Sequence, residues 1–337
     1  MIDDFQRLLG GLRGLSRPEL LTLDAAVRGL LAEPRVAVPV APPSDLPEPG
    51  PPLPAGPAPD GIAAIEAAFA ASPECPHCQS KEVGKWGTAN RLKRYRCKAC
   101  KTSFNALTGT PLAQLHKREL WVGHAQALVD GISLRKVAAR LDVHLETAFR
   151  WRHRFMTAPK AVKAVKVQGT VEADETYFRR SFKGARKLLR KARKRGGEAA
   201  KVGLSDEQVP VLIVRDRNAA TTDAILIDRS AKSIGAVLEP IIDRRAVLVT
   251  DAEPAFSAFA NDHEIAHVSL VASKKERSWD GYHIQHVNAY CGELKGWMFR
   301  FRGVATKYLD SYLGWHRMND RDGNTQTARS VMAAAWG

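Results

Sequence analysis

The chain has 337 residues, a formal net charge of +15 and a pI near 9.8. This length allows two or three domains, and the positive charge favours an anionic partner, nucleic acid before membrane. No apolar run reaches the roughly 18 residues that a membrane span needs, and the acidic first residues are unlike a signal peptide. We therefore expect a cytoplasmic, nucleoid-associated protein with no membrane partner.

The first 60 residues predict a small helical element followed by a linker. Leucines at helical spacing indicate a helical hairpin over residues 1–34. A role in dimerisation or DNA-end binding and a plain helical appendage both remain open for this hairpin. Proline and alanine dominate residues 35–60, and this composition predicts an extended linker.

Four of the five cysteines form two CxxC pairs, Cys75 with Cys78 and Cys97 with Cys100. Four thiolates from two tight turns can close a tetrahedral zinc site, so we expect a zinc ribbon over residues 70–110 with a structural Zn²⁺. The alternative of two redox motifs lacks a thioredoxin-like βαβ context. His77 lies inside the first pair and is expected to be exposed, because four sulfur ligands already suffice.

Basic and aromatic residues surround these cysteines. The pattern is typical of a surface that contacts phosphates and stacks on bases. Trp86 and Tyr95 are the interleaved aromatic residues. The basic residues expected to contact DNA here are Lys93, Arg94, Arg96 and Lys98.

Residues 111–160 have the spacing of a helix-turn-helix. Ser133 is a candidate N-cap for its first helix, the turn falls at 142–144, and the second helix covers 146–155. In such a unit the second helix enters the major groove, although a pure packing unit is the alternative for a short helical pair. The residues expected to contact DNA are Thr147, Arg150, Arg152 and Arg154.

A different domain begins near residue 165, where two apolar runs carry aspartates. Asp174 lies in the middle of a predicted strand, and a second predicted strand ends at Asp251. A carboxylate on a central strand is costly to bury unless it is paired or binds a metal. Each aspartate alone is readily explained as a strand-end or capping residue. Together, in a basic chain, they predict a divalent-metal site acting on nucleic acid.

Two glutamates flank Asp174 on its strand. We expect Glu172 and Glu175 to point to the opposite face and to be secondary to the site. The strand is followed by a run with eleven lysines and arginines between positions 179 and 201. Such a run is usually a solvated arm, but beside a metal site it is well placed to grip a phosphodiester backbone. Its candidate DNA contacts are Arg186, Lys187 and Arg190.

The remaining pattern predicts a ribonuclease-H-like fold over residues 165–320. Strands are expected at 209–215, 222–227, 246–251 and 267–271, with helices at 231–242 and from 255. The order βββαβαβ, then a long helix, is the order of that fold. The chain is thus expected to be a multi-domain α+β and α/β protein, with a mixed-sheet catalytic domain. Residues 321–337 form a tail to which we assign no role.

The chain resembles bacterial insertion-sequence transposases of the DDE type, in the ISXO2-like branch with a zinc ribbon and a helix-turn-helix. The resemblance spans about residues 70–318 and is carried by CPHC, CKAC, the helix-turn-helix, VEADETYF, VTDAEPAF and HVNAY…LKGWMFRFRGVATKYLDSYLGW. It implies double-stranded DNA partners, namely terminal inverted repeats and target DNA, and a homo-oligomer assembled on them. It also implies DNA strand cleavage and strand transfer with Mg²⁺ or Mn²⁺.

The third metal ligand departs from the commonest family pattern of a glutamate seven residues before a lysine. Asn288 precedes Lys295 by seven residues, as in a branch where asparagine replaces the acid. We expect Asn288 rather than Glu293, which is the only carboxylate of that helix and falls on a different face. Cys291 lies one turn past Asn288, where some relatives place the acid.

The resemblance assigns roles to these residues. Asp174 would bridge two metal ions, Asp251 would hold one, and Asn288 would complete the other. Lys295 would position a phosphate, with His283, His286 and Tyr290 as supporting residues of the cleft. A transcription regulator, a catalytically decayed remnant and a metal-dependent nuclease without strand joining remain as alternatives.

Overall fold

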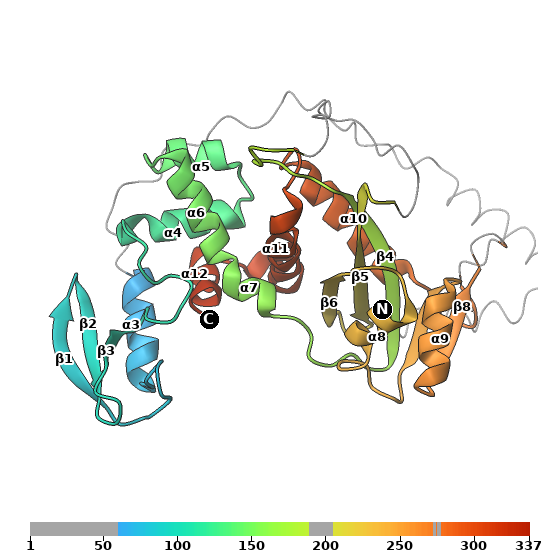
Figure 1. The fold of residues 1–337 in the computed structure, drawn as a ribbon, viewed down its shortest axis with the longest axis horizontal. Coiled ribbons are helices and arrows are strands. Elements are labelled where there is room, and N and C mark those ends of the chain that lie inside the picture. The colour runs from blue at the N-terminus through green and yellow to red at the C-terminus, as the bar shows by residue number, and fades with distance from the viewer. Residues whose placement is uncertain (1–59, 189–204, 272–273, 275–277) are drawn as a thin grey trace, which may run out of the picture. The chain divides into compact units, whose positions relative to one another are not determined.

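The computed structural model describes residues 60–188, 205–271, 274 and 278–337 (Figure 1). The predicted N-terminal hairpin, all but the last residue of the predicted linker, and Arg190 lie outside these residues. The described part of the chain contains a three-stranded sheet and a five-stranded sheet. None of the helices described is both long enough and apolar enough to cross a membrane.

The three-stranded sheet is antiparallel and packs against a helix that precedes it. The elements are α3 (Asp60–Ala71), β1 (Val83–Ala89), β2 (Leu92–Cys97) and β3 (Ser103–Asn105). The ring of Phe69 on α3 lies 5.0 Å from the ring of Tyr95 on β2, and Phe104 on β3 completes this small core. Helix α3 was not among the predicted elements, although Ile62, Ile65 and Phe69 have the spacing of one helical face.

The helices that follow include the predicted helix-turn-helix. They are η1 (Arg118–Leu120), α4 (Trp121–Val129), α5 (Leu134–Arg140), α6 (Leu145–Phe155) and α7 (Thr157–Ala161). Ser133 caps α5 as predicted, since its side chain accepts a hydrogen bond from the backbone N–H of Lys136. Trp121 and Phe155 are fully buried and meet edge to face, with ring centroids 6.1 Å apart. The turn between α5 and α6 falls where it was expected.

The C-terminal helix belongs to this same helical core. Helix α12 (Ala328–Trp336) buries Val331, Met332 and Ala335 in the cluster that contains Trp121. The indole N–H of Trp336 donates to the backbone carbonyl of Ala106 at 2.7 Å. The segment that we left without a role is therefore a structural part of the helical domain.

The second sheet has the predicted order of elements. Its strands are β4 (Thr170–Arg179), β5 (Gln208–Asp216), β6 (Thr221–Ile225), β7 (Val247–Asp251) and β8 (Ala266–Leu270). The strands lie in the order β6-β5-β4-β7-β8, with β4, β5 and β6 antiparallel and β7 and β8 parallel to β4. This mixed sheet is the ribonuclease-H-like arrangement, so the predicted fold class is confirmed.

Helices cover both faces of the sheet. The covering helices are α8 (Ala231–Leu238), α9 (Pro254–Asp262), α10 (Gln285–Phe299) and α11 (Leu309–Asp322), with the short η3 (Thr306–Tyr308) and η4 (Gly323–Thr325) beside α11. Ala173 of β4 packs with the residues of α8 and α9, whereas Ile213 of β5 packs with the residues of α10 and α11. Because strand residues alternate between faces, even-numbered residues of β4 face α10.

Candidate functional site

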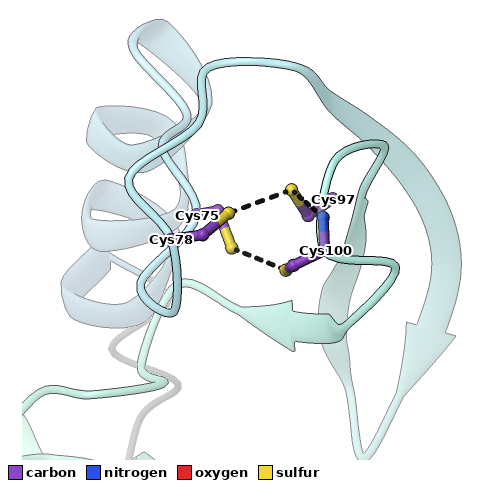
Figure 2. Close-up of side chains that lie close together, drawn as sticks. All are labelled: Cys75, Cys78, Cys97 and Cys100. Carbon is purple, nitrogen blue, oxygen red and sulfur yellow. Dashed lines mark hydrogen bonds between the residues drawn. The ribbon is translucent and has the colours of Figure 1, made fainter.

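The four paired cysteines come together from two segments (Figure 2). Cys75 and Cys78 lie in the turn before β1, whereas Cys97 ends β2 and Cys100 lies in the turn that follows it. Their Sγ atoms all lie within 4.8 Å of one another. The distances from Cys75 to Cys100 and from Cys78 to Cys97 are both 3.6 Å, too long for disulfide bonds. Four thiolates at this separation suit a structural Zn²⁺ and leave no open coordination position. His77 is exposed beside them, as expected.

The two predicted aspartates lie on neighbouring parallel strands. Ala173 of β4 is in register with Thr250 of β7. The next residue on each strand is an aspartate, so Asp174 and Asp251 lie side by side. Both carboxylates are partly buried. Burial and the negative charge of Asp251 raise the pKa of Asp174 from 3.8 to about 6, while Lys295 acts in the opposite direction. Two acids are therefore held together where their mutual repulsion is only partly relieved.

Helix α10 presents one turn toward Asp174. Cys291 is buried, and burial together with the charge of Asp174 raises the pKa of its thiol to about 12. Asn288 precedes Cys291 by three residues and Lys295 follows it by four, so all three lie on one side of the helix. Asn288 and Lys295 are exposed, which places them at the edge of the buried contact.

Glu293 lies on a different side of α10. It is exposed and follows Cys291 by two residues, which corresponds to a rotation of about 200° around the helix. Its side chain therefore points away from the side that faces Asp174. Of these two residues, Asn288 is the one that shares a side of α10 with Cys291.

The expectation for the flanking glutamates was wrong for Glu172. Residues two apart on a strand share a face, so Glu172 lies on the same face as Asp174, where it contacts the first turn of α10. Glu175 points to the other face, as expected, and pairs with Arg229, which also pairs with Glu253. Burial raises the pKa of Glu175 to about 7, with Arg229 opposing the shift.

The predicted cleft-lining residues have different environments. His283 and His286 gather around Glu172, their Nδ1 atoms lying 3.6 Å and 3.1 Å from its Oε1. Tyr290, in contrast, lies on the buried side of α10, where its ring meets the ring of His316 edge to face. Its assignment to the cleft was therefore incorrect, because it occupies the buried side of the helix.

The predicted DNA contacts of the second helix of the helix-turn-helix divide into two groups. Arg150 is exposed and Thr147 is half-buried. Arg152 is buried, donates to the Ile132 carbonyl at 2.7 Å and lies over the ring of Trp315, so its prediction as a DNA contact was wrong. Arg154 is half-buried and donates to backbone carbonyls of residues 111 and 113.

Two exposed cations of this unit were not among the predicted DNA contacts. Arg135 and Lys136 are exposed in the first turn of α5. They could have been predicted from the usual placement of the first helix of a helix-turn-helix across the DNA backbone. They extend the exposed positive charge beyond α6.

The ribbon presents one aromatic residue among its cations. Trp86 is 50% exposed, and the guanidinium of Arg96 lies 4.6 Å from the centre of its ring. Lys93 and Lys98 are exposed, whereas Arg94 is half-buried and donates to the Ser103 hydroxyl at 2.8 Å.

Tyr95 is not available for stacking on bases. It is buried in the ribbon core, which corrects the earlier expectation. In the part of the basic arm that the structure describes, Arg186 and Lys187 are exposed.

Two family models match parts of the chain that carry these features. Residues 166–315 match the family model of the ISXO2-like transposase domain, and residues 116–159 match that of a homeodomain-like domain. The chain thus contains an ISXO2-like transposase domain preceded by a homeodomain-like unit. A relative in Halobacterium salinarum, described as an uncharacterized protein in transposable element ISH50, is 26% identical over 245 residues, covering 71% of this chain and 82% of its own.

Solved structures with distant similarity include two complexes of Mos1. A pre-cleavage Mos1 transpososome is 12% identical, with a TM-score of 0.21 over 64% of this chain and 79% of that chain. The Mos1 strand transfer complex is 13% identical, with a TM-score of 0.22 over 64% and 78%. The fold of the larger domain is defined by its strand order, β6-β5-β4-β7-β8.

Proposed function

We propose that the protein is the transposase of an insertion sequence, which binds terminal inverted repeats and catalyses metal-dependent DNA strand cleavage and strand transfer. The observation that carries the proposal is the placement of Asp174 and Asp251 side by side, facing the turn of α10 that bears Asn288 and Lys295. The raised pKa of Asp174 supports a site that gains from a bound cation.

The oxygen donors of this site fit Mg²⁺ or Mn²⁺. Asp174 and Asp251 offer carboxylate oxygens, and the side-chain carbonyl of Asn288 offers a neutral one. When bound, such ions activate an attacking hydroxyl and stabilise the leaving oxygen of a phosphodiester. Lys295 lies on the same side of α10 as Asn288 and presents a positive charge to a phosphate of the DNA.

The exposed cations of the other domains suit a duplex DNA partner. Arg150 of α6 and Arg135 and Lys136 of α5 supply contacts to a groove and to phosphates. Trp86, with Arg96 over its ring, adds an aromatic surface on the ribbon. Assembly as a homo-oligomer on paired DNA ends belongs to the same proposal.

Strand transfer in vitro tests the reaction. Zinc-loaded protein is mixed with Mg²⁺ or Mn²⁺ and a labelled duplex carrying the terminal repeat of the element. Joined products are expected from wild type and from Glu293→Ala and Glu239→Ala, but not from Asp174→Ala, and they should be strongly reduced in Asn288→Ala. Repeat binding without cleavage in either metal would refute the proposal and favour a DNA-binding regulator or a decayed enzyme.

A further inference from the structure

Helix α10 begins without a capping side chain from its own N-cap residue. The N-cap is Ile284, whose side chain makes no capping hydrogen bond, and the intrahelical ladder starts with the N–H of Asn288 bonded to the Ile284 carbonyl. The three N–H groups before Asn288 therefore need other acceptors. The ring of His283 accepts from the Gln285 N–H at 3.3 Å.

Glu172 of β4 accepts the other two. Its Oε2 receives the backbone N–H of His286 at 2.8 Å and that of Val287 at 3.0 Å. A serine or aspartate cap would normally accept from one of these two groups. Here Glu172 accepts from both, although it lies on a strand more than a hundred residues earlier. The negative charge of Glu172 also complements the positive end of a 15-residue helix.

The second oxygen of Glu172 is engaged as well. Its Oε1 lies 3.0 Å from Nε of Arg217 and 3.1 Å from Nδ1 of His286. Glu172 is completely buried, so these partners compensate the loss of water around its charge.

The same contacts argue against a metal ion among Glu172, His283 and His286. Their ligand atoms lie within 4.8 Å of one another. However, Arg217 already pairs with Glu172, and its Nη1 lies 3.0 Å from Nε2 of His283. A guanidinium in this position repels a second cation. The cluster is thus an anchor for α10 rather than a second metal centre.

This anchor connects the two sides of the proposed active site. Glu172 and Asp174 lie on the same face of β4, two residues apart and therefore roughly 7 Å along the strand. Asn288 is the residue after Val287, whose backbone N–H donates to Glu172. We propose that Glu172 is a positioning residue: it fixes the first turn of α10 against β4 and so sets Asn288 and Lys295 opposite Asp174.

The inference rests on the proposed function for the roles of Asn288 and Lys295, but the anchoring itself can be measured without activity. Full-length, zinc-loaded Glu172→Ala and Glu172→Gln are compared with wild type and with Glu239→Ala, which removes an exposed carboxylate at the end of α8. Hydrogen exchange is followed in a peptide covering residues 284–290. Mn²⁺ affinity is measured by calorimetry, and repeat binding by fluorescence anisotropy.

We expect exchange in this peptide to accelerate roughly tenfold in Glu172→Ala, and Mn²⁺ affinity to fall roughly tenfold. Glu172→Gln keeps one acceptor oxygen and should lie between Ala and wild type, while repeat binding should stay within about twofold in all variants. Glu172→Gln also serves if Glu172→Ala does not fold. Unchanged exchange and unchanged Mn²⁺ affinity in the folded variants would overturn the inference. Wild-type protein that binds repeats but never cuts DNA would refute the proposed reaction, while exchange and Mn²⁺ binding would still decide the role of Glu172.

Discussion

Replacing Asp174 by asparagine tests whether the aspartate pair is strained without a cation. Burial and Asp251 raise the pKa of Asp174 from 3.8 to about 6 in the folded protein. A folded-state pKa above the unfolded value means that ionisation of this group costs stability. The cost is absent below about pH 4, grows toward pH 6 and is complete above it. Two pKa units correspond to roughly 3 kcal/mol, which is an upper estimate for a partly exposed group.

In magnesium-free buffer, Asp174→Asn is therefore expected to be more stable than wild type by up to about 3 kcal/mol at pH 8, with little difference at pH 4. Added Mg²⁺ or Mn²⁺ should reverse the order. A bound ion stabilises only the protein that holds it, by about 4.1 kcal/mol at a free concentration of 1,000 times Kd, which exceeds the gain expected from the substitution.

Urea unfolding at pH 4, 6 and 8, with and without Mn²⁺, measures both effects. Chelators are omitted so that the ribbon keeps its zinc. Asp262→Asn, at the exposed end of α9, is the matched control and should change stability by less than about 0.5 kcal/mol. The reasoning would be refuted by a variant that is no more stable than wild type at pH 8, or by a gain that does not depend on pH.

Three further changes probe the other parts of the site. Asn288→Glu adds a charged ligand and should tighten Mn²⁺ binding roughly tenfold in calorimetry, whereas unchanged affinity would exclude this position from the metal site. Cys97→Ser should abolish the stoichiometric zinc found by atomic absorption and lower the melting temperature of the ribbon. An unchanged zinc content with an unchanged melting temperature would contradict a four-thiolate centre. Arg150→Ala should weaken repeat binding with stability changed by less than about 0.5 kcal/mol, while Arg152→Ala should cost roughly 3 kcal/mol in urea unfolding. Equal effects of the two arginine substitutions on stability would show that burial does not distinguish them.

The order of elements and the zinc site were predictable because they depend on local spacing. Two CxxC pairs present four thiolates whatever the rest of the chain does, and Ser133 marks a helix start through a bond made within four residues. The alternation of apolar residues placed the strands of the larger sheet within a few positions of their observed ends. The neighbouring placement of Asp174 and Asp251 could be predicted because a carboxylate in an apolar strand is conspicuous without any partner.

The tertiary structure decided every feature that depends on contacts distant in sequence. Arg152 reads as a surface cation of a helix, yet α11 brings Trp315 against it and makes it part of a core. Helix α12 is too short to predict its own packing partner, which is α4, a helix that lies far earlier in the sequence. Period-two alternation alone should have placed Glu172 beside Asp174, but only the packing of α10 on β4 shows that its carboxylate holds the helix start. Sequence by itself determined which chemical groups are present and how each segment folds locally. Packing between distant segments determined which of those groups face one another, because burial and charge pairing act across the sheet and not along the chain.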